Sequence, residues 1–131
     1  MTDPVTRLVQ AIDRKDPEAI RAAYAPDARL VTMTPNTFGV ATGAGDVAAK
    51  LSEWFTSWGE EPSYAFLGTV REGDRAVVEF ERTTTYEGAD WVVRQAHVLE
   101  VGPAGIVEHR AYCSGPREGA PELAAAYGGG R

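Results

Sequence analysis

Hydrophobic and polar positions alternate with a period of two through the second half of the chain, which predicts a sheet of long strands. From residue 63 onward the segments SYAFLGTVR, RAVVEFERTTTY, WVVRQAHVLEV and IVEHRAYC are separated by EGD, EGAD and GPAG. Such alternation is typical of strands with one buried face and one solvated face. We therefore expect four consecutive strands joined by short turns.

The GPAG turn sets the expected register of the last two strands. Because proline fixes φ at about −65°, Pro103 excludes a primed two-residue turn. We expect a three-residue loop with Gly105 as a left-handed bulge. The predicted cross-strand pairs are Gly102–Ile106, Val101–Val107, Leu99–His109 and His97–Ala111.

This register gives the hairpin two chemically different faces. The charged side chains that share one face are Arg94, Glu100, Glu108 and Arg110. The opposite, apolar face also holds Gln95, His97 and His109. An unpaired polar group buried there costs on the order of 1 to 3 kcal/mol, so these three side chains need partners or a function.

The strand over residues 75–86 repeats this partition. If Tyr86 pairs with Trp91 across EGAD, then Arg82 and Thr84 lie on the inner face, together with Val78 and Phe80. We therefore expect a cluster of Arg82 with the three polar side chains of the hairpin.

The first half of the chain shows helical spacing instead. Asp3-Pro4 and Asp16-Pro17 are helix start signals, an N-cap acid followed by proline at the first helical position. The apolar positions predicted for these two helices are Val5, Leu8, Val9 and Ile12, then Ile20, Ala23 and Tyr24, with Pro26 ending the second helix. A strand follows over Ala28–Thr34, and then a loop rich in proline and glycine over residues 35–45.

A third, amphipathic helix is predicted after this loop, with Asp46 as its cap. It presents Val47, Leu51, Trp54, Phe55 and Trp58. Three helices must then cover one side of a curved antiparallel sheet, which gives an α+β cone with a pocket. We assign residues 1–115 to this domain and residues 116–131 to a Gly/Ala/Pro-rich tail, with one helical turn over residues 121–127.

Composition narrows the possible functions. The chain of 131 residues suits one domain, and 13 basic against 19 acidic residues give a net charge of −6, which argues against nucleic acid or an anionic membrane as partner. With no membrane-length apolar run and no signal-peptide pattern, we expect a cytoplasmic protein. The single Cys113 permits no internal disulfide and is interpreted as core filler.

Three segments, DRKDPEAIRAAYAPDARLV, TGAGDVAAKLSEWF and GIVEHRAYCSG, resemble the NTF2-like superfamily, and within it the SnoaL-like group. The resemblance covers roughly residues 5 to 115. It implies an NTF2-like (cystatin-like) conical barrel, commonly a homodimer. The pocket of such proteins serves cyclases, isomerases, dehydratases and epoxide hydrolases, and also non-catalytic binding proteins.

The resemblance carries over few functional residues. Arg82 matches the catalytic arginine of limonene-epoxide hydrolase, but the two aspartates of that enzyme fall on Thr84 and Ala111. The general base of ketosteroid isomerase falls near Thr32, which cannot accept a proton in that way. Asp13 matches a carboxylate that orients a catalytic histidine in scytalone dehydratase.

Our hypothesis from the sequence is a SnoaL-like enzyme without cofactor, which performs acid/base chemistry on a small hydrophobic, oxygenated, polyketide-like metabolite. His109 and His97 would move protons, with Asp13 orienting one of them, and Arg82 would hold a substrate oxygen. The expected substrate-binding residues are Gln95, Thr84, Thr32, Tyr24, Trp54, Phe55, Trp58 and Tyr64. Phe38 is a further aromatic candidate for the pocket.

Alternatives remain open for each group. The histidines can instead be buried and neutral, bonded to a neighbour such as Gln95, and with Cys113 they make an incomplete ligand set, so no metal is predicted. Arg82 can pair with an internal acid, Asp13 can be a solvated surface acid, and the aromatic residues can be plain core. The whole protein can be a small-molecule-binding module, or a dimer whose function lies on the outer face of the sheet.

Overall fold

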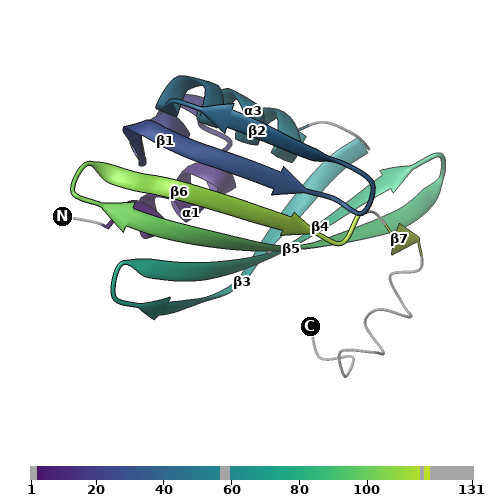
Figure 1. The fold of residues 1–131 in the computed structure, drawn as a ribbon. Coiled ribbons are helices and arrows are strands. Elements are labelled where there is room, and N and C mark those ends of the chain that lie inside the picture. The colour runs from purple at the N-terminus through teal and green to yellow at the C-terminus, as the bar shows by residue number, and fades with distance from the viewer. Residues whose placement is uncertain (1–2, 57–59, 116, 119–131) are drawn as a thin grey trace.

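The computed structural model describes residues 3–56, 60–115 and 117–118. These residues form three helices and a strongly curved sheet (Figure 1). The elements are α1 (Pro4–Arg14), α2 (Pro17–Ala22), β1 (Tyr24–Met33), β2 (Phe38–Thr42), α3 (Ala44–Thr56), β3 (Glu60–Glu72), β4 (Arg75–Tyr86), β5 (Ala89–Gly102), β6 (Gly105–Cys113) and β7 (Arg117–Glu118).

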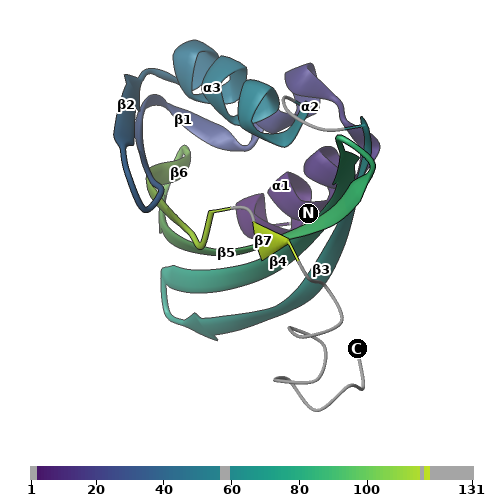
Figure 2. The same ribbon diagram turned by 90° about the vertical axis from the view of Figure 1, so that its right-hand side faces the viewer.

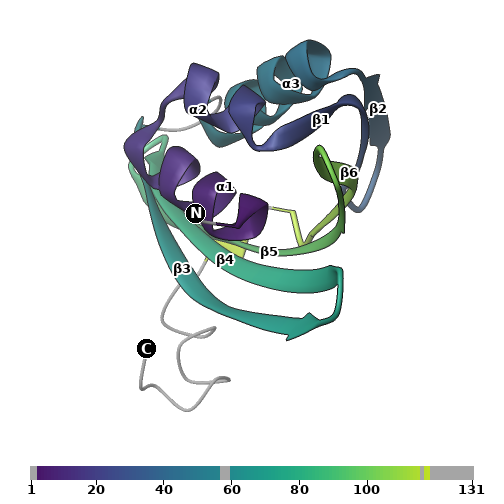
Figure 3. The same cartoon turned by 90° about the vertical axis from the view of Figure 1, so that its left-hand side faces the viewer.

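The sheet is mixed but mostly antiparallel. Its strand order is β2-β1-β6-β5-β4-β3, with the short β7 paired to β5. Neighbouring strands are antiparallel except for β1 and β6, which are parallel. The sheet curls around α1, while α2 and α3 close the open side (Figures 2 and 3). The predicted α+β architecture, helices on a curved sheet, is confirmed.

Both predicted helix starts are confirmed. The Asp3 carboxylate accepts a hydrogen bond from the Val5 N–H at 2.9 Å, and that of Asp16 accepts one from the Ala19 N–H at 3.2 Å. The first helix ends at Arg14, and its C-cap residue Lys15 adopts a left-handed conformation with φ 53°. These caps satisfy backbone donors that the first turn of each helix leaves without an internal partner.

Three predictions for the first half of the chain are wrong. Helix α2 ends at Ala22, and Tyr24 already begins β1, so Tyr24 lies on a strand that continues through Pro26. Helix α3 begins at Ala44, which places Asp46 inside its first turn. The expected loop over residues 35–45 contains strand β2, which pairs with β1. Trp58 and the helical turn expected over residues 121–127 lie outside the described residues.

The β5–β6 hairpin differs from the prediction near its turn. Gly102 pairs with Gly105 and Val101 with Ile106, whereas Glu100 pairs with Glu108. The extra residue is therefore Val107, two positions further from the turn than predicted. Beyond this bulge the predicted pairs Leu99–His109 and His97–Ala111 are confirmed.

The β4–β5 hairpin is also tighter than predicted. Tyr86 pairs with Ala89, and Trp91 faces Thr84 and not Tyr86. The two turn residues, Glu87 and Gly88, both have positive φ, at 50° and 77°. This is the pattern of a type I′ turn. The shift is by two residues, so the predicted inner face is retained.

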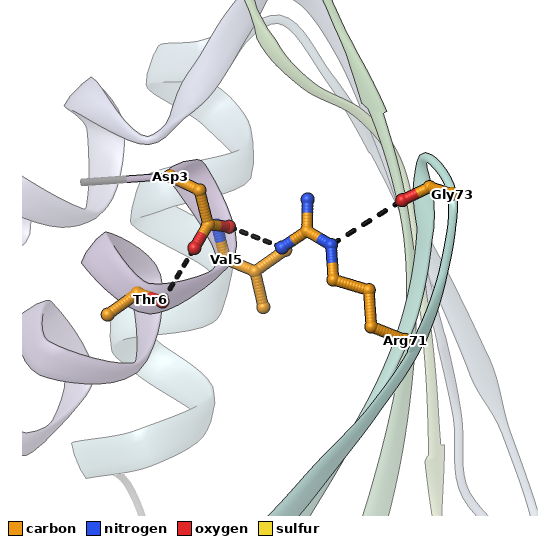
Figure 4. Close-up of polar contacts among 5 residues, drawn as sticks. All are labelled: Asp3, Val5, Thr6, Arg71 and Gly73. Atoms are coloured by element: carbon orange, nitrogen blue, oxygen red, sulfur yellow. Dashed lines mark hydrogen bonds and ion pairs between the residues drawn. The ribbon is translucent and has the colours of Figure 1, made fainter. Parts of the chain in front are cut away.

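An ion pair fixes α1 against the β3–β4 hairpin. Arg71 donates to Asp3 at 2.5 Å, and its Nε donates to the Gly73 carbonyl at 3.5 Å (Figure 4). Thr6 also donates to Asp3, at 2.7 Å. Burial alone would raise the pKa of Asp3, but the hydrogen bonds from Thr6, Arg71 and Val5 outweigh it and lower the pKa to about 2.

The core lies between the inner face of the sheet and the three helices. Its most deeply buried apolar side chains include Leu30, Val47, Leu51, Leu99 and Ile106. Six polar or charged residues are buried on the same side, namely Thr32, Arg82, Thr84, Gln95, His97 and His109. None of the described helices has the length and apolar character needed to cross a lipid bilayer.

Candidate functional site

A continuous row of hydrogen bonds runs through the core. The Tyr24 hydroxyl lies 2.6 Å from His109 Nδ1, His109 Nε2 lies 2.6 Å from His97 Nδ1, and His97 Nε2 lies 2.8 Å from Gln95 Oε1. Tyr24 comes from the start of β1, His109 from β6, and the other two from β5. We call these four residues the polar chain.

The chemistry of Gln95 fixes the direction of every bond in the polar chain. Its Oε1 is an acceptor, so His97 Nε2 must carry a proton and donate. A neutral His97 then accepts at Nδ1, so His109 Nε2 donates to it. His109 in turn accepts at Nδ1, and the Tyr24 hydroxyl donates there. All four ring nitrogens of the histidines therefore have partners within the core.

Burial keeps both histidines neutral. His97 is 1% exposed and His109 is fully buried. Burial lowers the pKa of His97 to about 3. It also lowers the pKa of His109 well below its ordinary range, and the neighbouring His97 adds to this effect. Desolvation disfavours the charged form of an imidazole, and nothing in the polar chain supplies a compensating negative charge.

Three aromatic rings pack around His97. The ring centroids of Phe55 and Phe80 lie 5.9 and 5.2 Å from that of His97, and the Trp54 ring lies 6.2 Å away. The predicted residues Trp54 and Phe55 thus pack against His97. They support the polar chain on the side of α3.

Beyond Gln95 the polar chain reaches the edge of the core. Burial raises the pKa of the Cys113 thiol, against hydrogen bonds from the Gly115 N–H and from Gln95 and the nearby charge of Arg82. Because Gln95 Oε1 accepts from His97, its amide nitrogen is the group that faces Cys113. Arg82 is 5% exposed, and its guanidinium lies 5.7 Å from the centre of the Tyr64 ring. Cys113, Gln95 and Arg82 therefore form one neighbourhood at the end of the polar chain.

A cavity of about 280 Å³ lies between α1 and strands β3 and β4. We call it the α1–β3 cavity. It is lined by Val9, Gln10, Ile12, Asp13, Tyr64, Phe66 and Phe80. Asp3 meets Arg71 at one end of α1 and Asp13 shares the cavity with Tyr64 at the other, so α1 runs antiparallel to β3.

Phe80 forms a common wall between the α1–β3 cavity and the polar chain. Its ring lines the cavity and also contacts His97 edge-on. Neither histidine lines the cavity. A larger depression of about 630 Å³ opens at the surface between α2 and the start of α3, where Glu18, Arg21 and Asp46 line it. Its mixed charges and open shape make it a poorer site for a small molecule than the α1–β3 cavity.

The structure brings together part of the predicted site. Gln95, His97, His109 and Tyr24 are linked directly, although Tyr24 contributes its hydroxyl, whereas it was expected as an aromatic wall. Asp13 is exposed and lines the cavity, and the histidine nitrogens it was expected to orient have other partners. Thr32 and Thr84 are buried. Phe38 is 71% exposed on β2, so the suggestion that it lines the pocket is wrong.

Phe66 is a cavity residue that the sequence analysis did not name. Tyr64 and Phe66 are two positions apart on β3, and they pair with Arg82 and Phe80 of β4. The period of two already places Phe66 on the same face as Tyr64. That alternation was the available signal for it. For Val9 and Gln10, no sequence signal distinguishes a cavity wall from ordinary helix packing.

The described residues include no group of three or more His, Cys, Asp or Glu side chains arranged to hold a metal ion.

Comparisons with solved structures place the fold. An NTF2-like protein from Burkholderia thailandensis is 23% identical, with a TM-score of 0.73 over 87% of this chain and 92% of that one. An NTF2-like protein of unknown function from Mesorhizobium loti is 20% identical, with a TM-score of 0.70 over 86% and 88% of the two chains.

A hypothetical protein with a ketosteroid isomerase-like fold from Catenulispora acidiphila, solved in complex with trimethylamine, is 19% identical. Its TM-score is 0.66, over 87% of each chain. No curated protein matches this chain in sequence. The family model of the SnoaL-like domain matches residues 5–109. The chain therefore belongs to the SnoaL-like domain family and has the NTF2-like fold.

Proposed function

We propose that this protein binds a small, mainly apolar molecule in the α1–β3 cavity. The cavity itself carries the proposal: about 280 Å³ with three aromatic side chains and one carboxylate in its wall. Ligand pockets are usually concave and apolar, with few polar groups, and begin at about 300 Å³. The trimethylamine complex of the Catenulispora protein supports small-molecule binding by a protein of this fold.

In this proposal the two histidines have a structural role. Each ring nitrogen is bonded within the polar chain, and Phe80 lies against both the chain and the cavity. A general acid or base needs a ring nitrogen within hydrogen-bond reach of the substrate. In this role the polar chain supports Phe80, whose ring contacts His97 and lines the cavity.

The second candidate is the cofactor-free acid/base enzyme acting on a hydrophobic, oxygenated metabolite. The observation that favours it is the unbroken row of donors and acceptors from Tyr24 to Gln95, which ends beside Arg82 and Cys113. In that candidate, Gln95, Arg82 and Thr84 would hold a substrate oxygen whose negative charge grows in the transition state.

A blocked cavity tests the first proposal. Gln10 is exposed and lines the cavity, so Gln10→Trp places a large ring at its rim, while Arg14→Trp, one turn further along α1, is the matched control. We would record methyl NMR spectra with a library of small neutral, cationic and anionic molecules. Binding molecules should shift the signals of Val9 and Ile12 in the control but not in Gln10→Trp. Equal shifts in both variants would place the binding site elsewhere.

The same samples separate binding from catalysis. A ligand that is recovered unchanged supports a binding protein, whereas an altered product supports the enzyme. For any molecule that turns over, the double variant with His97→Gln and His109→Gln should lose the activity if the histidines move protons. Unchanged turnover in a folded double variant would exclude them as the acid and base.

We also propose that the protein forms a homodimer through the outer face of the sheet. The exposed apolar side chains there, which we call the outer band, are Met33, Phe38, Val40, Val70, Val77 and Tyr112. Met33 pairs with Phe38 on one side and with Tyr112 on the other, so the band is continuous across three strands. Arg110, which forms an ion pair with Glu100 at 2.8 Å, lies in the cross-strand row that connects Val40 to Val77. A surface with several exposed apolar side chains and few charged ones is typical of the centre of protein interfaces.

A further inference from the structure

We propose that the α1–β3 cavity is selective for an organic ammonium ion, a positively charged nitrogen carrying small alkyl groups. This inference rests on the proposed binding function and adds the charge of the ligand. Two properties of the wall carry it: the sign of its charge and the chemistry of its aromatic side chains.

The charge of the cavity wall is negative. Asp13 is the one ionisable acid that lines it, and none of the described residues in its wall is basic. Asp13 also lies in the last turn of α1, where the carbonyl ends of the helix add partial negative charge. The chain as a whole carries a net charge of −6, which raises the local concentration of cations.

The aromatic side chains offer the faces that an alkylammonium ion prefers. Phe66 lies on the inner face of β3, where it pairs with Phe80, and it is 50% exposed and lines the cavity. Its ring centroid lies 6.1 Å from that of Phe80, and the planes are tilted by 55°. A cation over such faces is attracted by the negative charge above the ring, and the alkyl groups bury apolar area at the same time.

Tyr64 is fixed and already accepts a cation. Its hydroxyl donates to the Phe55 carbonyl at 2.9 Å, which sets the orientation of the ring. The Arg82 guanidinium lies 5.7 Å from the ring centre without lining the cavity. The half-exposed ring of Phe66 is therefore the one most available to a bound ligand, and Phe80, 3% exposed, packs next to it.

The basic residues near the end of α1 lie outside the α1–β3 cavity. Arg14 donates from Nε to the Gln10 carbonyl at 3.3 Å. Lys15 lines a separate small cavity beneath α2, together with Pro17 and Ile20. Asp13 thus contributes the charge that a ligand in the cavity meets directly.

A matched series of three probes tests the charge preference. Choline, 3,3-dimethylbutan-1-ol and 3,3-dimethylbutanoate share the same branched end and differ in charge. We would measure their dissociation constants by NMR titration of the Val9 and Ile12 methyl signals at low ionic strength. We expect choline to bind about fivefold or more tighter than the alcohol, and the carboxylate to bind weakest.

Two variants assign the preference to the wall. Asp13→Asn should weaken choline binding severalfold and leave the alcohol unchanged, while Phe66→Leu should weaken choline more than the alcohol because it removes the aromatic face. Asp16→Asn is the control, since Asp16 is an exposed acid close to Asp13 in the sequence that does not line the cavity.

The outcomes separate this inference from the proposed function. If choline and the alcohol bind equally, or the alcohol binds better, the cavity binds small molecules without preferring a cation, and the inference is wrong. If none of the three probes binds but neutral or anionic members of the fragment library do, the inference is wrong and the binding function stands. If nothing binds in the cavity, both are wrong.

Discussion

His97 and His109 show how a residue's surroundings decide its chemistry. Imidazole ordinarily titrates near neutral pH, and that property motivated the acid/base hypothesis. In the core each ring is neutral, both of its nitrogens are bonded, and aromatic rings pack against His97. A proton added to either ring would have to displace a hydrogen bond and charge a group without contact to water.

The neutral histidines predict a loss of stability in mild acid. Burial lowers the pKa of His97 to about 3 and that of His109 well below its ordinary range. Below about pH 6.5 the unfolded chain binds protons at both positions while the folded chain does not. The free energy of unfolding therefore decreases as the pH is lowered. Between about pH 7 and about pH 5 the loss should be about 2 kcal/mol per histidine. Urea unfolding at several pH values measures it.

A single substitution provides the control for this prediction. His97→Gln removes one titrating group, so the slope of unfolding free energy against pH should fall to about half, whatever the variant's stability at neutral pH. A wild-type free energy that stays constant from about pH 7 to about pH 5 would show that the folded chain also takes up these protons.

Only part of the residue-level arrangement of the site could be predicted from the sequence. The shared inner face of Gln95, His97 and His109 followed from the period of two and one turn, because neighbouring strands transmit register locally. The donor that completes the row, Tyr24, is separated from His109 by 85 positions. Its partner is set by the parallel pairing of β1 with β6, and no local pattern encodes such a pairing.

At the scale of elements, the alternation of inward and outward side chains along the strands was predicted more reliably than the type of turn between them. Both hairpin turns differ from the prediction, yet away from the turns the inner faces agree with it. Next to the GPAG turn, Ile106 and not Val107 pairs with Val101 and is buried. The EGAD hairpin is displaced by two positions, which returns every side chain to its face. In the β5–β6 hairpin, Val107 supplies the extra residue that Gly105 was expected to supply. Strand β2 escaped prediction because its apolar side chains Phe38 and Val40 point to the exposed face within a glycine-rich segment.

Gly105 is the point at which two elements meet without room for a side chain. Its φ is +124°, and a Cβ atom there would lie 2.9 Å from backbone atoms of Ala23, Tyr24 and Ala25. The next residue, Ile106, donates its N–H to the Ala23 carbonyl at 3.0 Å. The glycine therefore allows β6 to approach the start of β1, where Tyr24 reaches the polar chain.

Replacement of this glycine should be costly. We expect Gly105→Ala to lower the free energy of unfolding by at least about 3 kcal/mol. The backbone must move to make room for the Cβ atom, and alanine is strained at a positive φ. Gly88→Ala is the control, because Gly88 has φ +77° with nothing within 4 Å, and it should cost about 1 kcal/mol. Urea unfolding compares the two, and similar losses would show that the contact with β1 is not tight.

At the scale of the whole molecule, the sheet has two faces with separate tasks. Its concave face surrounds α1 (Figure 2). The same face holds the core, the polar chain and the α1–β3 cavity. Its convex face carries the outer band and the ion pairs Arg94–Glu81 and Arg110–Glu100. The sheet therefore allows self-association on the convex face without closing the cavity, and the proposed dimer and the proposed ligand do not compete for surface.

This separation predicts that dimerisation can be removed without loss of ligand binding. Tyr112 is 45% exposed in the middle of the outer band, so Tyr112→Glu would place an unpaired charge at the centre of a two-fold interface. Analytical ultracentrifugation should show a dimer for the wild type and a monomer for this variant, while Tyr86→Glu, at the far end of β4, should remain dimeric. Because the cavity lies on the opposite face, probe binding should be the same in all three proteins. A monomeric wild type would contradict the dimer, and weaker probe binding in the Tyr112 variant would show that the two faces are coupled through the sheet.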